Sequence, residues 1–158
     1  MSSATLARFI LRARRAAGLR GQVNVLVTDD RELRAFNRKF RGKNKTTDVL
    51  SFPASPHAQV SRPFAGDLAI SLNMAKSAAL RLGHSTAQEV KILVLHGILH
   101  LAGFDHERHN GEMAARESQL RQRLKLESGL IERAQVPRVR KRREKSEPRT
   151  ALARRSSA

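Results

Sequence analysis

The sequence contains no cysteine, no tryptophan and no tyrosine, and six phenylalanines are its whole aromatic set. A chain without cysteine forms no disulfide and no zinc site with thiolate ligands, and it cannot hold an iron–sulfur cluster through cysteine. Any transition metal that it binds must therefore take its protein ligands from histidine, aspartate and glutamate.

Long hydrophobic runs are also missing. No apolar stretch approaches the roughly 20 residues that a membrane-spanning helix requires, and the sequence does not start with a secretory signal. We therefore expect a cytoplasmic protein with no membrane partner. The first 21 residues are rich in arginine and free of acids, as in some organelle-targeting peptides. A helix that faces the core is the favoured interpretation, because apolar residues recur at helical spacing: Leu6, Phe9, Ile10, Ala13 and Ala17.

Acidic residues are scarce relative to basic ones. The 158 residues include 31 Lys or Arg against 14 Asp or Glu, a net charge of +17. Such a charge attracts polyanions, a class that includes RNA, DNA and anionic membrane surfaces. Residues 133–158 hold ten Lys or Arg against two Glu. We predict one domain over residues 1–132, followed by a basic, disordered tail over 133–158.

The domain should contain both strands and helices. Residues typical of β-strands occur at 22–29, 49–52 and 66–71. Helical spacing predicts five helices, namely within the first 21 residues, at 31–40, at 72–82, from 86 to about 104, and at about 110–128. The fourth helix follows Ser85 and Gln88, which have the spacing of a capping box. It is apolar on nearly every side toward its end and must be buried.

The most informative segment is HGILHLAGFDH, residues 96–106. On a helix, His96 and His100 lie one turn apart on the same face and can reach a single ion. Gly103 can end the helix and let the chain return His106 as a third ligand. Three imidazoles leave one position open on zinc, as in catalytic sites. The alternative is that these histidines are ordinary core or surface residues, but imidazoles without partners are costly to bury in an apolar helix. One zinc ion is therefore predicted, with nickel and copper as alternatives.

The histidine spacing also matches the HExxHxxGxxH run of metzincin proteases. In those proteases the Glu accepts a proton from the metal-bound water, but Gly97 occupies this position here and has no side chain for that role. A zinc metalloprotease-like hydrolase therefore remains an alternative, although this route to peptide hydrolysis is disfavoured.

HGILHLAGFDH closely resembles the HGxLHLxGyDH signature of the YbeY family of rRNA-maturation endoribonucleases. RGKNKTTDVLSFP at 41–53 resembles that family's basic loop and strand, and GDLAIS at 66–71 is similar to its GDixIs segment. Glu112, Met113 and Glu117 fall where its last helix carries similar residues. The resemblance covers about residues 22–127. Thr46 replaces the usual Pro, and the chain starts in a helix instead of the family's N-terminal strand.

The resemblance implies an α+β fold, a small mixed sheet of three to four strands packed with about five helices. It places a zinc site at the mouth of a cleft, on the long buried helix and the following turn. The implied activity is single-strand-specific RNA cleavage in late small-subunit (16S) rRNA maturation and ribosome quality control. His96, His100 and His106 carry over as zinc ligands, and Arg41 as the cationic catalytic residue. The implied partners are ribosomal RNA, the small ribosomal subunit and a ribosomal protein. A non-catalytic assembly factor that binds rRNA is the second alternative.

Charge stabilisation suggests the mechanism. Zinc and the Arg41 guanidinium would stabilise negative charge on the phosphoryl oxygens. The nucleophile is either hydroxide on zinc or the RNA 2′-hydroxyl, and the sequence leaves both open. Arg38, Lys43 and Lys45 would follow the phosphate backbone. With so few aromatic rings, recognition should be mostly electrostatic and only weakly specific for sequence.

The other polar residues near this segment have two interpretations each. Asp105 either orients a ligand imidazole or is a turn residue. Asp67 is either a cleft carboxylate or a turn cap. Glu89 either lies on the same helix face as His96, or interacts with a partner in the first turns of its helix. The remaining histidines are predicted to be surface residues: His57, His84 and His109.

Overall fold

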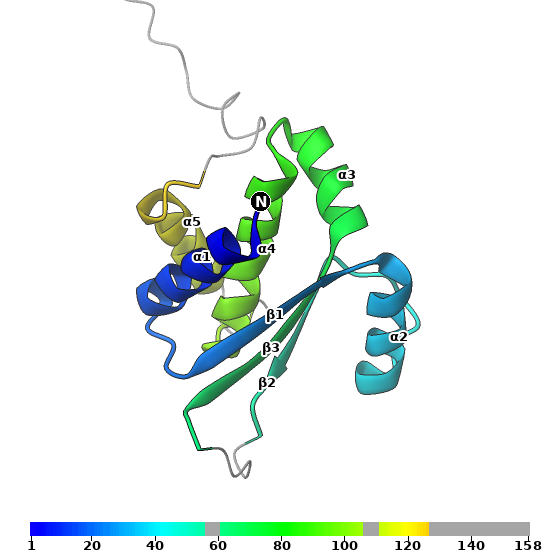
Figure 1. The fold of residues 1–158 in the computed structure, drawn as a ribbon, viewed down its shortest axis with the longest axis horizontal. Helices are drawn as coiled ribbons and strands as arrows, with labels where there is room; N and C mark the ends of the chain where they lie inside the picture. Colours follow the sequence, from blue (N-terminus) through cyan, green and yellow to red (C-terminus); the bar gives the residue numbers. More distant parts are fainter. Residues whose placement is uncertain (56–60, 106–110, 127–158) are drawn as a thin grey trace, which may run out of the picture.

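Five helices and three strands make up the part of the chain that the computed structural model describes, residues 1–55, 61–105 and 111–126 (Figure 1). In chain order they are α1 (Ser3–Ala17), β1 (Gln22–Thr28), α2 (Asp30–Arg41), β2 (Val49–Pro53), β3 (Phe64–Ser71), α3 (Leu72–Leu82), α4 (Thr86–Leu101) and α5 (Glu112–Arg123). The predicted α+β class with a small sheet and about five helices is confirmed. The last helix was predicted at about 110–128. In the described residues it runs only from Glu112 to Arg123 and is therefore shorter.

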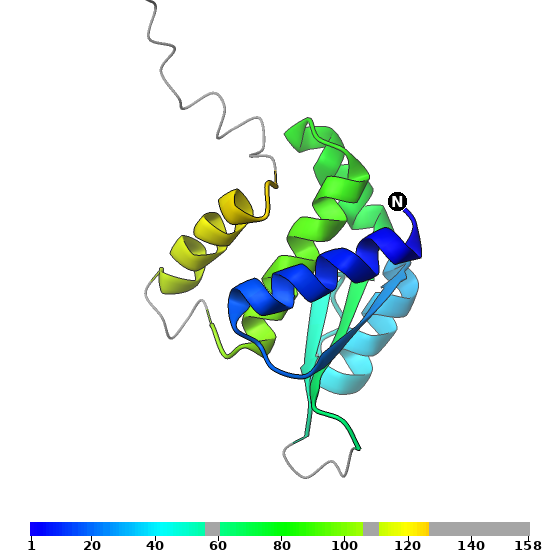
Figure 2. The same cartoon turned by 60° about the vertical axis from the view of Figure 1, so that its left-hand side comes forward.

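The sheet is mixed and has the order β1-β3-β2. The central strand β3 runs parallel to β1 and antiparallel to β2. Successive side chains of a strand point to opposite faces, so Leu68 and Ile70 face α4, whereas Asp67 and Ala69 face α2. Figures 1 and 2 show α1 and α4 on one side of the sheet and α2 on the other. Helices therefore pack on both faces of the sheet.

The long helix α4 lies at the centre of the main core. Its buried residues point in nearly every direction around the helix axis, because the sheet, α1, α3 and α5 all pack on it. Val94, Leu95, Ile98 and Leu99 are all completely buried. The prediction that this apolar helix is buried is therefore confirmed.

The first helix belongs to the fold. Phe9 and Ala13 are buried in the main core with α4, and Leu6, Ile10 and Ala17 pack partly buried against it. Ser2 caps the start of the helix through a bond to the N–H of Thr5. These contacts support the core-facing interpretation over a separate targeting peptide.

One prediction about histidines was wrong. His84 is not a surface residue, because its side chain is only 1% exposed and its Nε2 lies 2.5 Å from Oε2 of Glu89. Glu89 thus has a partner near the start of its own helix, which is one of the two roles considered for it. His57 and His109 lie outside the described residues. No helix in the described parts of the chain is both long and apolar enough to span a membrane.

Candidate metal centre and cleft

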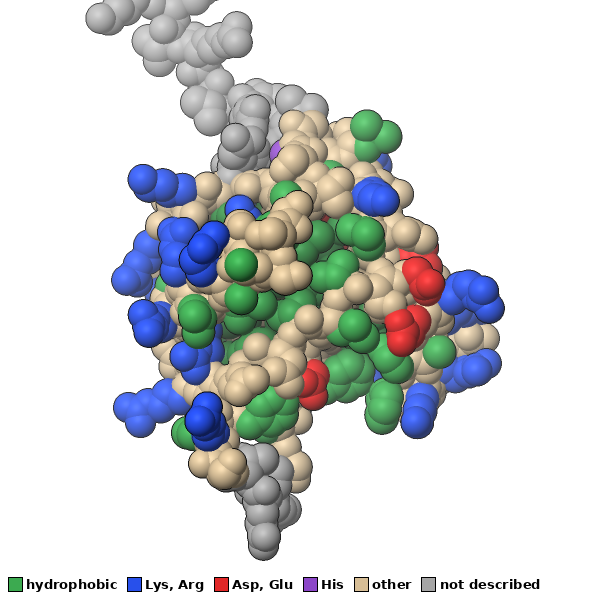
Figure 3. All heavy atoms as spheres, viewed as in Figure 1, with side chains coloured by type: hydrophobic (Ala, Val, Ile, Leu, Met, Phe, Trp, Pro, Cys, Tyr) green, Lys and Arg blue, Asp and Glu red, His purple; other side chains and the backbone are tan. Residues whose placement is uncertain are grey.

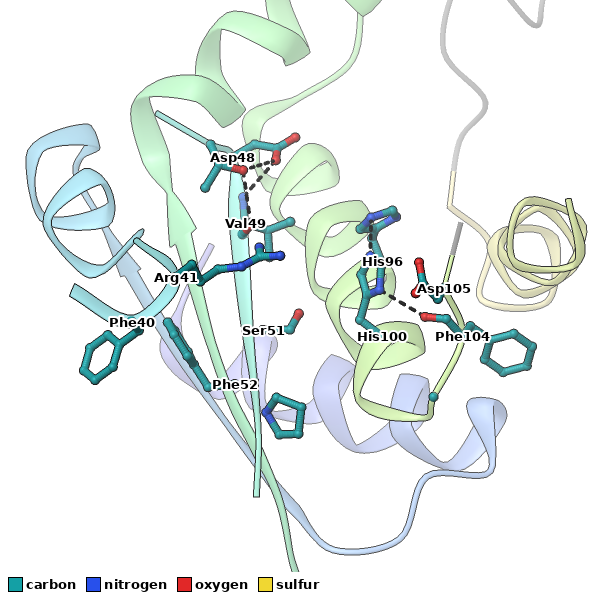
Figure 4. Close-up of a pocket in the computed structure, with 13 residues that line it drawn as sticks. Phe40, Arg41, Asp48, Val49, Ser51, Phe52, His96, His100, Phe104 and Asp105 are labelled. Atoms are coloured by element: carbon teal, nitrogen blue, oxygen red, sulfur yellow. Dashed lines mark hydrogen bonds between the residues drawn. The ribbon is translucent and has the colours of Figure 1, made fainter. Parts of the chain in front are cut away.

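Two of the three predicted ligands come together on the exposed side of α4. His96 and His100 are four residues apart on the helix, their ring centroids are 4.8 Å apart, and their Nε2 atoms are 3.2 Å apart (Figure 4). His106, the third predicted ligand, lies outside the described residues. Within the described residues no cluster of three or more His, Asp or Glu side chains is positioned to bind a metal. His96 and His100 are therefore the two predicted ligands whose geometry can be compared with that of a zinc site.

The opposite nitrogen of each ring has a partner that fixes its orientation. Nδ1 of His100 lies 3.0 Å from the carbonyl oxygen of Phe104, and Nδ1 of His96 lies 2.9 Å from Oε2 of Glu117. A carbonyl oxygen can only accept a hydrogen bond, so Nδ1 of His100 must donate. An ionised Glu117 imposes the same tautomer on His96. In neutral rings, each Nε2 then carries a lone pair, and the two Nε2 atoms lie 3.2 Å apart.

Glu117 is held in its ionised form by two neighbours. Burial of its carboxyl by itself raises the pKa, but the hydrogen bond with His96 and the positive charge of Arg121 outweigh it, so the pKa lies below its usual value. Arg121, one turn further along α5, contacts the other carboxylate oxygen. A charged acceptor behind a ligand imidazole is the usual support of a metal-binding histidine.

The spacing of the two nitrogens suits a tetrahedral ion. Two ligands at the usual zinc–nitrogen distance and a tetrahedral angle are separated by about 3.3 Å, close to the 3.2 Å observed between the Nε2 atoms. His96 and His100 thus fit zinc in donor type, in tautomer and in spacing.

The turn after α4 follows from Gly103. Its φ of +94° is in the left-handed region, which favours glycine, and its N–H donates to the carbonyl of His100. The chain then reverses, so that the carbonyl of Phe104 reaches Nδ1 of His100 and Asp105 joins the wall beside the two rings (Figure 4). The helix ends at Leu101, before the predicted end near residue 104. The predicted turn at Gly103 is confirmed, and it directs the chain back past the imidazoles.

A cleft of about 1000 Å³ opens in front of the two rings. One wall is α4 with the turn after it, and the other is β2 with the end of α2. Ser51 on β2 donates a hydrogen bond of 3.4 Å to the carbonyl of Gly97 and ties the two walls together. Arg41, the last residue of α2, extends across β2 toward the imidazoles (Figure 4). The structure thus brings Arg41 to the same cleft as His96 and His100.

The other predicted cations lie near the cleft without lining it. Arg38, Lys43 and Lys45 are exposed, on the last turns of α2 and in the loop that follows. The loop is tied to the helix by Asn37, whose buried side chain donates to the carbonyl of Lys45 at 2.8 Å. The backbone that carries Lys45 is therefore fixed to the helix whose last residue, Arg41, lines the cleft.

Asp67 lies on the opposite face of the sheet. It accepts a hydrogen bond of 2.9 Å from the side chain of Asn24 and lines a separate hollow on the α2 side. The two imidazoles lie on the α4 side, so Asp67 does not support them. We leave it out of the metal centre.

Comparison with known proteins identifies the family. The sequence model described as "Endoribonuclease YbeY" matches residues 3–125. The chain belongs to the YbeY family. It is 57% identical over 137 residues to a curated endoribonuclease YbeY of Koribacter versatilis, with 87% of each chain covered. It is 47% identical over 128 residues to that of Solibacter usitatus, covering 81% of this chain and 83% of the relative. A Thermotoga maritima protein solved in solution shares the fold with a TM-score of 0.53 at 25% identity, covering 78% of this chain and 84% of that one.

The match to the YbeY family starts earlier than the motifs alone had indicated. The recognisable motifs begin near residue 22, whereas the family match begins at residue 3 and includes α1. This agrees with the packing of α1 on α4, and it makes α1 part of the family's shared domain.

Sequence reasoning did not assign a role to Glu117. The YbeY resemblance singled it out only as a position on the last helix, whereas the structure places its carboxylate against the imidazole of His96. The available signal was an acidic residue among the apolar positions Met113 and Leu120, which are buried on the same side of α5. A carboxylate on the buried side of a helix requires a partner there.

Proposed function

We propose that this member of the YbeY family is a single-strand-specific endoribonuclease with one zinc ion held by His96, His100 and His106. Its substrate is small-subunit (16S) rRNA, in late maturation and ribosome quality control in the cytoplasm. The observation that carries the proposal is the convergence of the two Nε2 atoms in a cleft that Arg41 also reaches. The names of the curated relatives supply the reaction class.

The residues of the cleft suit cleavage of a phosphodiester. A bound zinc ion would supply Lewis-acid stabilisation of charge on the phosphoryl oxygens. The Arg41 guanidinium is always protonated and can donate two parallel hydrogen bonds to the same phosphate. Glu117 and the Phe104 carbonyl hold the imidazole rings in place, so the site needs little rearrangement when RNA binds.

Residues around the cleft support an RNA substrate and its context. Arg38, Lys43 and Lys45 are exposed beside the cleft and would bind neighbouring phosphates. The expected partners are ribosomal RNA within the small ribosomal subunit, with a ribosomal protein as a further contact. Asp105, at the cleft wall, is proposed to assist in orienting the metal ligands.

The alternative of a metalloprotease-like hydrolase is opposed by packing. A Cβ atom at Gly97 would lie 2.7 Å from Cδ2 of Leu68, which is itself buried at 1% exposure. The position therefore has no room for the glutamate that the protease reaction requires.

Cleavage of pre-rRNA fragments by the purified, zinc-loaded protein tests the proposal. Arg41→Ala should reduce kcat/KM by about 100-fold or more, as the loss of a charge stabiliser in the transition state does. His100→Ala should lose both bound zinc and cleavage. Arg81→Ala is the matched control, since Arg81 is exposed on α3 and does not line the cleft. It should cleave as wild type does.

The outcomes separate the two remaining explanations. Equal cleavage by wild type, Arg41→Ala and His100→Ala would show that a contaminating nuclease acts. If His100→Ala loses zinc and keeps its fold by circular dichroism, yet still supports rRNA processing in cells, the protein acts as a non-catalytic assembly factor and the proposal is wrong.

A further inference from the structure

A second hollow, of about 550 Å³, lies on the α2 side of the sheet. Its walls are mostly apolar and contain two of the most exposed large hydrophobic side chains, Phe40 at 58% and Leu26 at 45%. Figure 3 shows hydrophobic side chains gathered over the sheet beside α2, with Asp and Glu as well as Lys and Arg near them. Exposed apolar surface that is gathered in one hollow favours a binding site.

The hollow adjoins the proposed active-site cleft. Phe40 and Phe52 line both, and Arg41, which reaches the cleft, directly follows Phe40. The rings of Phe36 and Phe40 are 6.2 Å apart, and those of Phe40 and Phe52 are 5.4 Å apart and nearly perpendicular. Three of the six phenylalanines therefore form an aromatic row from the hollow to the cleft.

The polar groups of the hollow are suited to a base and unsuited to a phosphate. Only Asn24 and Asp67 among its lining residues are polar, and Nδ2 of Asn24 donates to Oδ1 of Asp67. The Asp67 carboxylate repels phosphate but accepts hydrogen bonds from the exocyclic amino group of a base. Lys39 holds its Nζ over the Phe40 ring, 5.2 Å from the ring centre, so one face of that ring already meets a positive charge and the other is left for a base.

We infer that this hollow binds an unpaired nucleobase of the RNA strand, stacked on Phe40 and hydrogen-bonded through an exocyclic amino group to Asp67. The inference rests on the proposed function, because it takes the phosphate at Arg41 and the base in the hollow to belong to one strand. Single-stranded RNA is bound in this way elsewhere, by aromatic platforms beside a basic groove. A duplex cannot place a base in the hollow, so the site favours single strands.

Equilibrium binding to the full-length, zinc-loaded protein tests the stacking. The probes are fluorescent 2′-O-methyl oligocytidylate and oligouridylate, checked for integrity after each titration. Phe40→Ala should weaken the binding of both by about tenfold, as expected for the loss of one stacked base. Phe40→Tyr, which keeps the ring, should bind as wild type does. Leu80→Ala is the matched control, since Leu80 is 86% exposed on α3 and lines neither hollow.

The hydrogen bond to Asp67 is tested by a ratio of affinities. Cytosine has an exocyclic amino group where uracil has a carbonyl, so wild type should bind oligocytidylate about fivefold more tightly than oligouridylate. Asp67→Asn should abolish this preference. The ratio cancels the general effect of removing a negative charge near RNA.

Failure of the inference is distinguishable from failure of the proposed function. If RNA is cleaved but Phe40→Ala binds both probes as wild type does, the inference is overturned, the nuclease stands, and the hollow is left to a protein partner. If the variants change probe binding as expected but neither the wild type nor any variant cleaves RNA, the base-binding site is supported and the proposed nuclease activity is wrong. A Phe40→Leu variant that binds like wild type would show apolar contact without stacking and would also overturn the inference.

Discussion

At the scale of single residues, the proposed metal centre depends on one carboxylate from a distant part of the chain. Glu117 lies 21 residues after His96 and holds its Nδ1 at 2.9 Å. Arg121 and burial at 8% exposure keep the carboxylate in place. Because the ring cannot rotate without losing this bond, the Nε2 lone pair stays directed at the cleft.

Replacing Glu117 should therefore weaken metal binding without unfolding the protein. Glu117→Gln removes the charged acceptor and places an amide beside Arg121, so zinc affinity should fall by about 10- to 100-fold, the usual effect of losing such a supporting group. Competition with a chelator of known affinity measures this. Glu112→Gln is the control, since Glu112 is exposed on the first turn of the same helix. Equal zinc affinity in both variants would contradict the assignment.

The sequence allowed the ligands to be predicted more readily than their support. The spacing of His96 and His100 and the position of Gly103 depend on local helix geometry, which the sequence encodes directly. The bond from Glu117 depends on how α5 docks on α4, which no local pattern specifies. Asp67 shows the same limit, because its side of the sheet follows from the register of β3 with β1.

At the scale of the elements, the contact of α4 with β3 leaves no space at Gly97. A Cβ there would lie 2.7 and 3.0 Å from the two terminal carbons of Leu68, which is buried. Gly97→Ala should therefore destabilise the fold by about 1–3 kcal/mol, as overpacking of a core does, even though alanine favours helices. Chemical denaturation measures the free energy of unfolding. Leu68→Val removes one carbon from the crowded side chain. The double variant should therefore lose less free energy of unfolding than the sum of the losses in the two single variants. If the two losses simply add, the two residues do not clash.

The junction between α3 and α4 contains the second testable contact. His84 and Glu89 are both nearly buried and lie 2.5 Å apart, so each is the other's polar partner across the start of α4. His84→Phe should cost about 2 kcal/mol, since it leaves a buried carboxylate without this hydrogen bond. The double variant with Glu89→Leu should recover much of the loss in the free energy of unfolding. If the double variant is less stable than His84→Phe alone, the pair is not the source of the stability.

The elements differ in how well they could be predicted. The cap at Ser85, which accepts a hydrogen bond from the N–H of Gln88, occurs as predicted, because capping is a local interaction. The order β1-β3-β2 could not be derived, since pairing joins residues far apart in the chain. His84 was misassigned for the same reason, as its burial depends on the packing of two helices.

At the scale of the whole molecule, positive charge is distributed over both the domain and the predicted tail. Residues 133–158 hold ten of the 31 Lys or Arg and lie outside the described residues. The groups that we propose act on RNA, Arg41 and the imidazoles, are in the domain. This division predicts that the two regions contribute differently, with the domain setting where RNA is cut and residues 133–158 adding general affinity.

Neutralising part of residues 133–158 in the full-length protein tests this division. Changing Arg140, Lys141, Arg142 and Arg143 to Gln should weaken binding of all single-stranded RNAs alike, because contacts to phosphate are independent of sequence. The slope of log K against log salt should become shallower by about 0.7 for each phosphate that the variant no longer neutralises. The cleavage position on a pre-rRNA fragment should not change.

The double variant Lys43→Gln with Lys45→Gln is the comparison, since these two exposed cations follow Arg41 in the chain. This double variant should also lower kcat/KM for that fragment. An unchanged salt slope in the fourfold variant would mean that those four cations do not bind RNA, and a shifted cleavage position would mean that they help to place the substrate.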